Sequence, residues 1–126
     1  MVETDRSKYK ILIVEDDFVN GKIVKTLLEK ANYSVEWVKN GKEALNILIP
    51  NPKEYTMVFM DIQMPIMNGY EVSLSLREIG IQIPIICMTA NAYCDEKTKS
   101  VEAGMNDYIS KPVTKSVLLE VVEKYL

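Results

Sequence analysis

The chain has 126 residues and a net charge of −3, from fifteen Lys and Arg against eighteen Asp and Glu. This length suits one domain that buries roughly two thirds of the surface of the unfolded chain. The mild negative charge argues against a general affinity for nucleic acid or anionic lipid. The sequence contains no histidine, which excludes Ser/His/Asp and Cys/His nucleophile systems and most zinc sites.

Residues 1–9 form a polar N-terminal extension without an apolar core. No later stretch approaches the ~20 apolar residues that span a bilayer, so we expect neither an export signal nor a membrane helix. The two cysteines, Cys87 and Cys94, form no CxxC pair, and we expect reduced thiols. A cytoplasmic location is the expectation that follows.

Apolar runs and helical spacings alternate along the chain. Short continuous runs rich in Ile, Val and Phe are typical of strands covered on both faces, and apolar residues three and four apart are typical of amphipathic helices. In chain order the pattern predicts a strand at 11–14, a helix at 19–28, a strand at 34–38, a helix at 42–48, strands at 57–60, 83–88 and 107–109, and a helix at 117–125.

The segment 70–77 alternates apolar and polar residues, which by periodicity alone favours a strand. A connection between parallel strands needs a crossover element, usually a helix, so we predict a helix there. The result is five β/α units: an α/β fold with a doubly wound parallel sheet and helices on both faces.

Polar residues follow the predicted strands at the ends where parallel sheets bind ligands. Glu15 and Asp16 follow the first strand, Asp61 the third, Thr89 the fourth and Lys111 the fifth. Carboxylates that converge repel one another, and a divalent cation relieves the repulsion. All-oxygen ligands without histidine or thiolate favour Mg²⁺.

Four pieces of the sequence, in this order, carry a family resemblance: "KILIVEDD", "MDIQMPIMNG", "MTANA" and "AGMNDYISKPV". The chain from Lys10 to Leu126 resembles a response-regulator receiver domain of two-component signalling. It looks most like the receivers of hybrid histidine kinases. The resemblance implies a single receiver domain over 1–126 with the flavodoxin-like strand order 2-1-3-4-5.

The resemblance also implies a phosphoacceptor and a metal site. Asp61 corresponds to the phosphoacceptor, and Glu15 and Asp16 to the acidic pair that holds Mg²⁺. Asp16 is expected to bind the metal directly and Glu15 through a water. The backbone carbonyl of Gln63 corresponds to a further ligand. Asp17 is left as a bystander that can cap the following helix.

The remaining roles carried over from the family concern switching and lifetime. Thr89 corresponds to the switch hydroxyl and Tyr108 to the aromatic residue that changes rotamer with it. Lys111 corresponds to the cation that holds the phosphoryl group, so that Asp61, Thr89 and Lys111 make up the catalytic set. Gln63 and Asn91 are candidates for tuning dephosphorylation.

The function implied is that of a receiver in a two-component or phosphorelay system. It accepts phosphate from a phosphohistidine, switches conformation and autodephosphorylates, as a signalling domain rather than a dedicated enzyme. Because the chain lacks histidine, the donor is external: a histidine kinase or a histidine phosphotransfer protein. A downstream protein would bind the face of the fourth helix, fifth strand and fifth helix, and neither nucleic acid nor membrane is an expected partner.

Two other functions stay open at this stage. A magnesium-dependent phosphatase of the haloacid dehalogenase type also uses a strand-end aspartate, but it needs a second acid two residues later, where this chain has Gln63. A receiver-like binding module that is never phosphorylated would typically lack the acceptor, the acid pair or the lysine. None of these is missing here.

Overall fold

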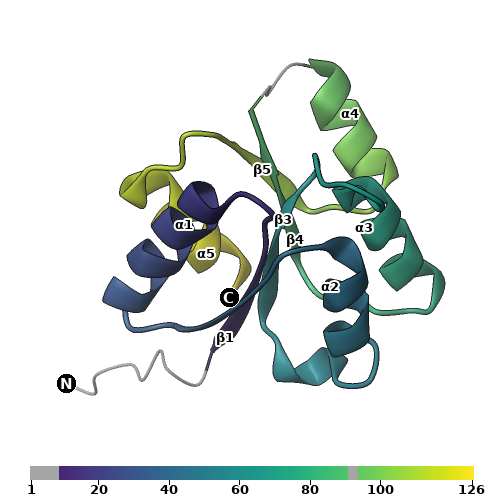
Figure 1. Cartoon of the computed structure of the whole chain (residues 1–126), viewed down its shortest axis with the longest axis horizontal. Coiled ribbons are helices and arrows are strands. Elements are labelled where there is room, and N and C mark those ends of the chain that lie inside the picture. Colours follow the sequence, from purple (N-terminus) through teal and green to yellow (C-terminus); the bar gives the residue numbers. More distant parts are fainter. Residues whose placement is uncertain (1–8, 91–93) are drawn as a thin grey trace.

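The computed structural model describes residues 9–90 and 94–126, and the side chains of that part except those of 94–96. A central sheet is covered by helices on both faces (Figure 1). The strands are β1 (Lys10–Val14), β2 (Ser34–Val38), β3 (Met57–Asp61), β4 (Ile85–Thr89) and β5 (Asp107–Ser110). The helices are α1 (Phe18–Lys30), α2 (Gly41–Leu48), a short 3₁₀ turn η2 (Pro52–Glu54), α3 (Gly69–Glu78), α4 (Cys94–Glu102) and α5 (Lys115–Tyr125).

All five strands are parallel, in the order β2-β1-β3-β4-β5. The predicted α/β class and strand order are confirmed. The register brings the strand ends to one edge: Val14 pairs with both Val38 and Met60, and Asp61 pairs with Met88. Residues that directly follow β1, β3, β4 and β5 therefore gather at this edge.

Two apolar cores lie on opposite faces of the sheet, because successive strand residues point to opposite sides. In Figure 1, α1 and α5 cover one face, and α2, α3 and α4 lie on the other. The first core joins α1 and α5 to strand residues that include Ile11, Ile13, Met57 and Phe59. The second joins α2 and α3 to strand residues that include Leu12, Val14, Val58 and Met60.

The segment 70–77 is helical, as the topology predicted and against its alternating pattern. Asn68 caps α3 in a reciprocal capping box: its side chain accepts from Glu71 N at 3.0 Å, and Glu71 Oε1 accepts from Asn68 N at 3.2 Å. Ser73 is fully buried, and its hydroxyl donates to the carbonyl of Ala103 at 2.6 Å. A polar residue thus lies on the buried face of α3, so the apolar residues of this segment do not show a helical spacing.

Other predicted boundaries shift by one or two residues. The strand predicted at 83–88 is observed as Ile85–Thr89, because Pro84 has no N–H to donate to the neighbouring strand.

Part of the apolar pattern that predicted α1 and α5 faces outward: Val19 is 64% exposed, Ile23 41% and Val117 44%. None of the helices in the described part of the chain is long and apolar enough to cross a membrane.

Replacement of Asn68 by alanine is expected to destabilise the fold by about 1 kcal/mol, because the N-cap hydrogen bond of α3 is lost. Urea unfolding should show a lower midpoint with an unchanged slope. Asn51→Ala is the matched control, since Asn51 precedes η2 without a side-chain cap bond. Equal stability of Asn68→Ala and Asn51→Ala would contradict this assignment.

Candidate functional site

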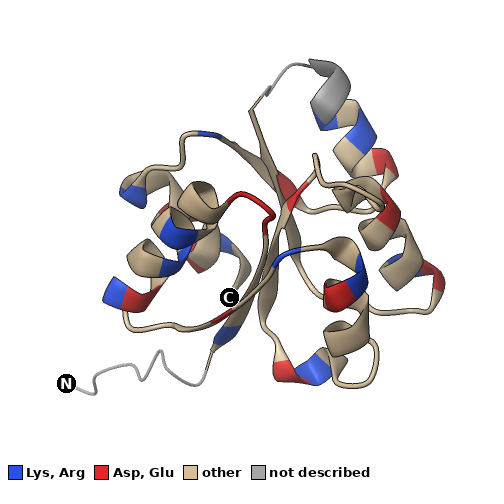
Figure 2. Ribbon diagram, in the orientation of Figure 1, with Lys and Arg blue, Asp and Glu red and all other residues tan. Residues whose placement is uncertain are grey.

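Three carboxylates meet at the carboxyl edge of the sheet. Glu15 and Asp16 directly follow β1, and Asp61 is the last residue of the adjacent β3. Each offers an oxygen, and these oxygens lie within 4.8 Å of one another. Glu15 and Asp61 are almost fully buried, whereas Asp16 is exposed. Figure 2 shows acidic segments at the ends of β1 and β3.

Lys111 reaches into this acidic cluster from the segment after β5. Its Nζ lies 2.7 Å from Glu15 Oε1 and 3.1 Å from Asp61 Oδ1. Its backbone N–H donates to the carbonyl of Thr89 at 2.8 Å, which fixes the start of the β5–α5 connection against the end of β4. One lysine therefore faces two buried carboxylates, and the exposed third lies beside them.

Contacts within the cluster shift the pKa values of Glu15 and Lys111. Burial, together with the hydrogen bond and charge of Asp61, raises the pKa of Glu15 to about 7, although Lys111 and the Asp17 N–H oppose this. Burial opposes the charge of Lys111, but contact with Glu15 and Asp61 raises its pKa above the ordinary value. A divalent cation beside Glu15 would favour its ionised form, and this donor set fits Mg²⁺.

The loop after β1 is held on both sides. Glu15 N donates to the carbonyl of Val38 at 3.1 Å, and the indole Nε1 of Trp37 donates to the carbonyl of Glu15 at 2.9 Å. Asp17 N donates to Glu15 Oε2 at 3.2 Å, and its own carboxylate caps α1 by accepting from Asn20 N at 3.0 Å. The predicted cap is confirmed. The contact of Trp37 was not predicted, since its only signal is an aromatic residue in a neighbouring strand.

The loop after β3 brings backbone close to Asp61. The N–H of Gln63 donates to Asp61 Oδ1 at 3.3 Å, and the Gln63 side chain is exposed. Gly69 begins α3 so near to this loop that a Cβ there would lie 2.5 Å from the carbonyl oxygen of Asp61. Glycine at position 69 therefore allows α3 to start against the end of β3.

Thr89 lies in β4, Tyr108 lies in β5, and Lys111 directly follows β5. Thr89 is buried at the end of β4, one residue after the partner of Asp61, and pairs with Ser110. Tyr108 is half-buried in β5 and lines a surface pocket of about 440 Å³ with Pro112 and Val117. Asn91, a predicted tuning residue, lies outside the described residues.

Residues 11–123 match the family described as "Response regulator receiver domain". The chain belongs to this family. As a receiver domain it is a component of two-component and phosphorelay signalling, as the sequence predicted.

Two relatives show how such domains occur. The receiver is 41% identical over 118 residues to the two-component response regulator 24 of Arabidopsis thaliana, covering 94% of this chain and 84% of that protein. It is 40% identical over 120 residues to the hybrid signal transduction histidine kinase I of Dictyostelium discoideum, covering 90% of this chain. It spans only 7% of the length of that kinase.

Solved structures share the fold. The chemotaxis protein CheY4 of Vibrio cholerae aligns with a TM-score of 0.86 at 26% identity, over 94% of this chain and 98% of that one. The receiver domain of a sensor histidine kinase from Pseudomonas aeruginosa aligns with a TM-score of 0.83 at 30% identity, over 93% and 96%. That second structure has a magnesium ion coordinated in its active site cleft.

Removal of one charge from the acidic cluster is expected to stabilise the metal-free receiver. In Asp61→Asn the repulsion on Glu15 disappears while the 2.7 Å contact between Lys111 and Glu15 remains. The free energy of unfolding in the presence of a chelator should rise by on the order of 1 kcal/mol. Urea unfolding at neutral pH measures the change.

Asp107→Asn provides the control for this experiment. Asp107 also pairs with a lysine, Lys124 at 3.3 Å, but it does not belong to the acidic cluster. The control should gain no stability. A loss of stability in Asp61→Asn would show that the contact between Lys111 and Asp61 outweighs the repulsion between the carboxylates.

Proposed function

We propose that this receiver accepts a phosphoryl group on the carboxylate of Asp61. The observation that carries the proposal is the position of Asp61: buried at the end of β3, inside an oxygen cluster and 3.1 Å from the Nζ of Lys111. A carboxylate nucleophile in phosphoryl transfer needs positive charge around the transferring oxygens, and this arrangement provides part of it.

In the proposed site Mg²⁺ would be held by Asp16 directly, by Glu15 through a water, and by Asp61 and the backbone carbonyl of Gln63. The cation would supply the charge that neutralises the phosphoryl oxygens. The fit rests on three oxygen donors within 4.8 Å, two of them buried. A magnesium ion is coordinated in the active site cleft of the similar receiver from Pseudomonas aeruginosa, which supports Mg²⁺ as the cation.

The chain's own groups would then act in sequence. A carboxylate oxygen of Asp61 forms a bond to phosphorus while the bond from phosphorus to the donor imidazole breaks, and the imidazole keeps that electron pair. Lys111 moves its contact from the carboxylates to a phosphoryl oxygen. The hydroxyl of Thr89 donates to another, and Gln63 and Asn91 are the residues proposed to tune the rate of dephosphorylation.

Output would be a shift between two conformations. Thr89 drawn toward the phosphoryl group makes room for Tyr108 to turn inward, which changes the surface of α4, β5 and α5. Tyr108 lines a pocket on this surface. The pocket supports the proposal that a downstream protein binds there. A shift from 1:99 to 99:1 would require about 5.5 kcal/mol in favour of the active form.

The partners proposed are a histidine kinase or a histidine phosphotransfer protein as donor, and a downstream protein at the face of α4, β5 and α5. The similarity to a hybrid signal transduction histidine kinase and to a two-component response regulator supports this kind of partner. A single receiver over 1–126 and a cytoplasmic location belong to the same proposal. The phosphatase alternative finds no second acid, because position 63 is glutamine.

Incubation with a small acyl-phosphate donor and Mg²⁺ is expected to add one phosphoryl group to the chain. Intact mass spectrometry should detect the added mass on the natural sequence and not on Asp61→Asn. Asp107→Asn, which changes an aspartate at the opposite end of the sheet, should label as the natural chain does. Equal labelling of Asp61→Asn would place the acceptor at another residue.

Mg²⁺ is expected to stabilise the folded receiver by about 1.4 kcal/mol at ten times its dissociation constant. In Asp16→Asn most of this gain should disappear, because a directly bound carboxylate is lost. Asp17→Asn removes the same charge one residue away and keeps a side chain able to cap α1. Thermal unfolding with and without MgCl₂ measures the gain. The same reduction in both variants would mean that only the general charge of the loop matters.

A further inference from the structure

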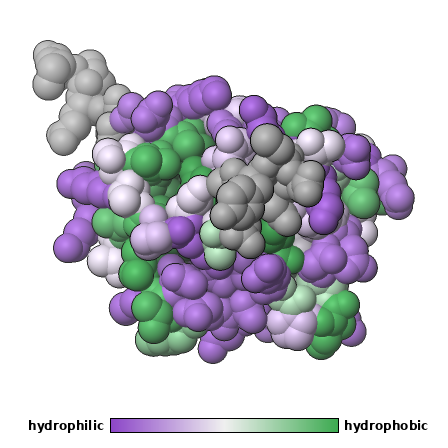
Figure 3. Space-filling view, turned by 90° about the horizontal axis from the view of Figure 1, so that it is seen from above, coloured by the Kyte–Doolittle hydropathy of each residue, from purple (hydrophilic) through white to green (hydrophobic). Residues whose placement is uncertain are grey.

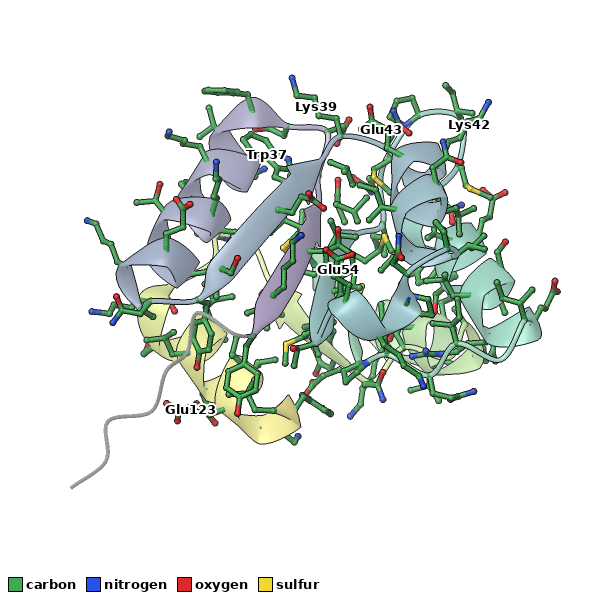
Figure 4. All side chains as sticks on the ribbon, turned by 90° about the horizontal axis from the view of Figure 1, so that it is seen from below. Trp37, Lys39, Lys42, Glu43, Glu54 and Glu123 are labelled. Carbon is green, nitrogen blue, oxygen red and sulfur yellow. The ribbon has the colours of Figure 1, made fainter. Side chains whose placement is uncertain are left out.

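The indole of Trp37 lies against the loop that carries the acidic pair. Its Nε1 donates to the carbonyl oxygen of Glu15 at 2.9 Å, and its ring packs on Phe18 at the start of α1, with ring centroids 5.7 Å apart. Figure 4 labels Trp37 beside α1, at the end of β2. The indole therefore contacts Glu15 and Phe18, the residues that flank Asp16 and Asp17.

Gly21 makes the space that this ring occupies. A Cβ at position 21 would overlap the Cζ2 and Cε2 atoms of the indole. Gly21 is buried in the first turns of α1 although glycine lowers helix stability. The ring could not keep its present place under α1 if position 21 carried any side chain. Position 21 and the indole therefore fit each other as a pair.

The loop needs such support because of its charge. Glu15 is buried beside Asp61, and repulsion between them favours any movement that separates the two segments. The backbone of Glu15 is bonded on both sides, through its N–H to the carbonyl of Val38 and through its carbonyl to the indole. Only the first of these bonds is between backbone groups, so the second depends entirely on the side chain at position 37.

The geometry points to Trp37 as a positioning residue of the metal site, which holds Glu15 and Asp16 in place for the cation and owes its own place to Gly21. This inference rests on the proposed function, since it concerns the same Mg²⁺ site. Trp37 does not touch the reacting atoms. Its effect is to hold the carboxylates of Glu15 and Asp16 close together before the metal binds, so that less of the loop has to become ordered on binding.

The test uses the fact that the chain contains a single tryptophan. Expression in a tryptophan auxotroph with benzothienylalanine replaces only Trp37, keeps the shape of the bicyclic ring and removes the N–H donor. The dissociation constant of Mg²⁺ is measured from backbone amide shifts of labelled protein titrated with MgCl₂. We expect it to rise about three- to tenfold, the equivalent of one hydrogen bond.

Two further variants separate positioning from general stability. Gly21→Ala, which displaces the ring, should weaken Mg²⁺ binding in the same direction. Tyr125→Phe removes another bond from an aromatic side chain to a backbone carbonyl, that of Asn106 at 2.9 Å. It lies at the opposite end of the sheet and should leave the dissociation constant unchanged even if it lowers the unfolding temperature.

The outcomes are distinct. If the natural chain binds Mg²⁺ at the amides around Asp16 and Asp61 and the analogue binds it equally well, the positioning role is wrong and the proposed function stands. If the natural chain shows no such shifts with MgCl₂, the proposed metal site itself fails. Should Gly21→Ala not fold, the analogue alone decides between these results.

Discussion

Crowding of negative charge at one edge of the sheet is the constraint on which this receiver depends. Two of the three carboxylates are buried, and their oxygens and that of the third lie within 4.8 Å of one another. Buried like charges destabilise a fold unless positive charge lies close to them. Among the residues that the structure describes, one lysine, Lys111, forms ion pairs with these carboxylates, so negative charge exceeds positive charge in the cluster. That imbalance suits the edge to a divalent cation and a transferring phosphoryl group.

The order of the strands explains which residue types can meet there. β1 and β3 are neighbours, so the short carboxylate side chains that follow them come together directly. β5 is separated from β3 by β4, and a long side chain is needed to cross that gap, which Lys111 does. Thr89 ends β4 between them. Seen from above in Figure 3, hydrophilic surface is interrupted by hydrophobic areas.

Much of this architecture was predictable because β1, β3 and β4 are short apolar runs that end in a polar residue or are directly followed by one. The helix at 70–77 was predicted correctly from the need for a crossover between parallel strands, and not from its apolar spacing. Ser73 interrupts that spacing, because it is buried with a hydrogen bond from its hydroxyl to the carbonyl of Ala103. The apolar spacing of α1 predicted the helix correctly but not its exposure: Val19 and Ile23 point outward. Periodicity identifies a helix, whereas the neighbouring elements decide how much of its surface is covered.

The sequence by itself determined the class of the fold, the order of its elements and the residue types at the end of each strand. These properties depend on the local apolar pattern and on the rule that parallel strands are joined by crossover helices. Only the tertiary structure decided that Lys111 contacts both Glu15 and Asp61, that Trp37 holds the carbonyl of Glu15, and that Gly69 lets α3 start against Asp61. Such contacts join residues distant in the chain, and their distances follow from how the strands and helices pack, which no local pattern encodes.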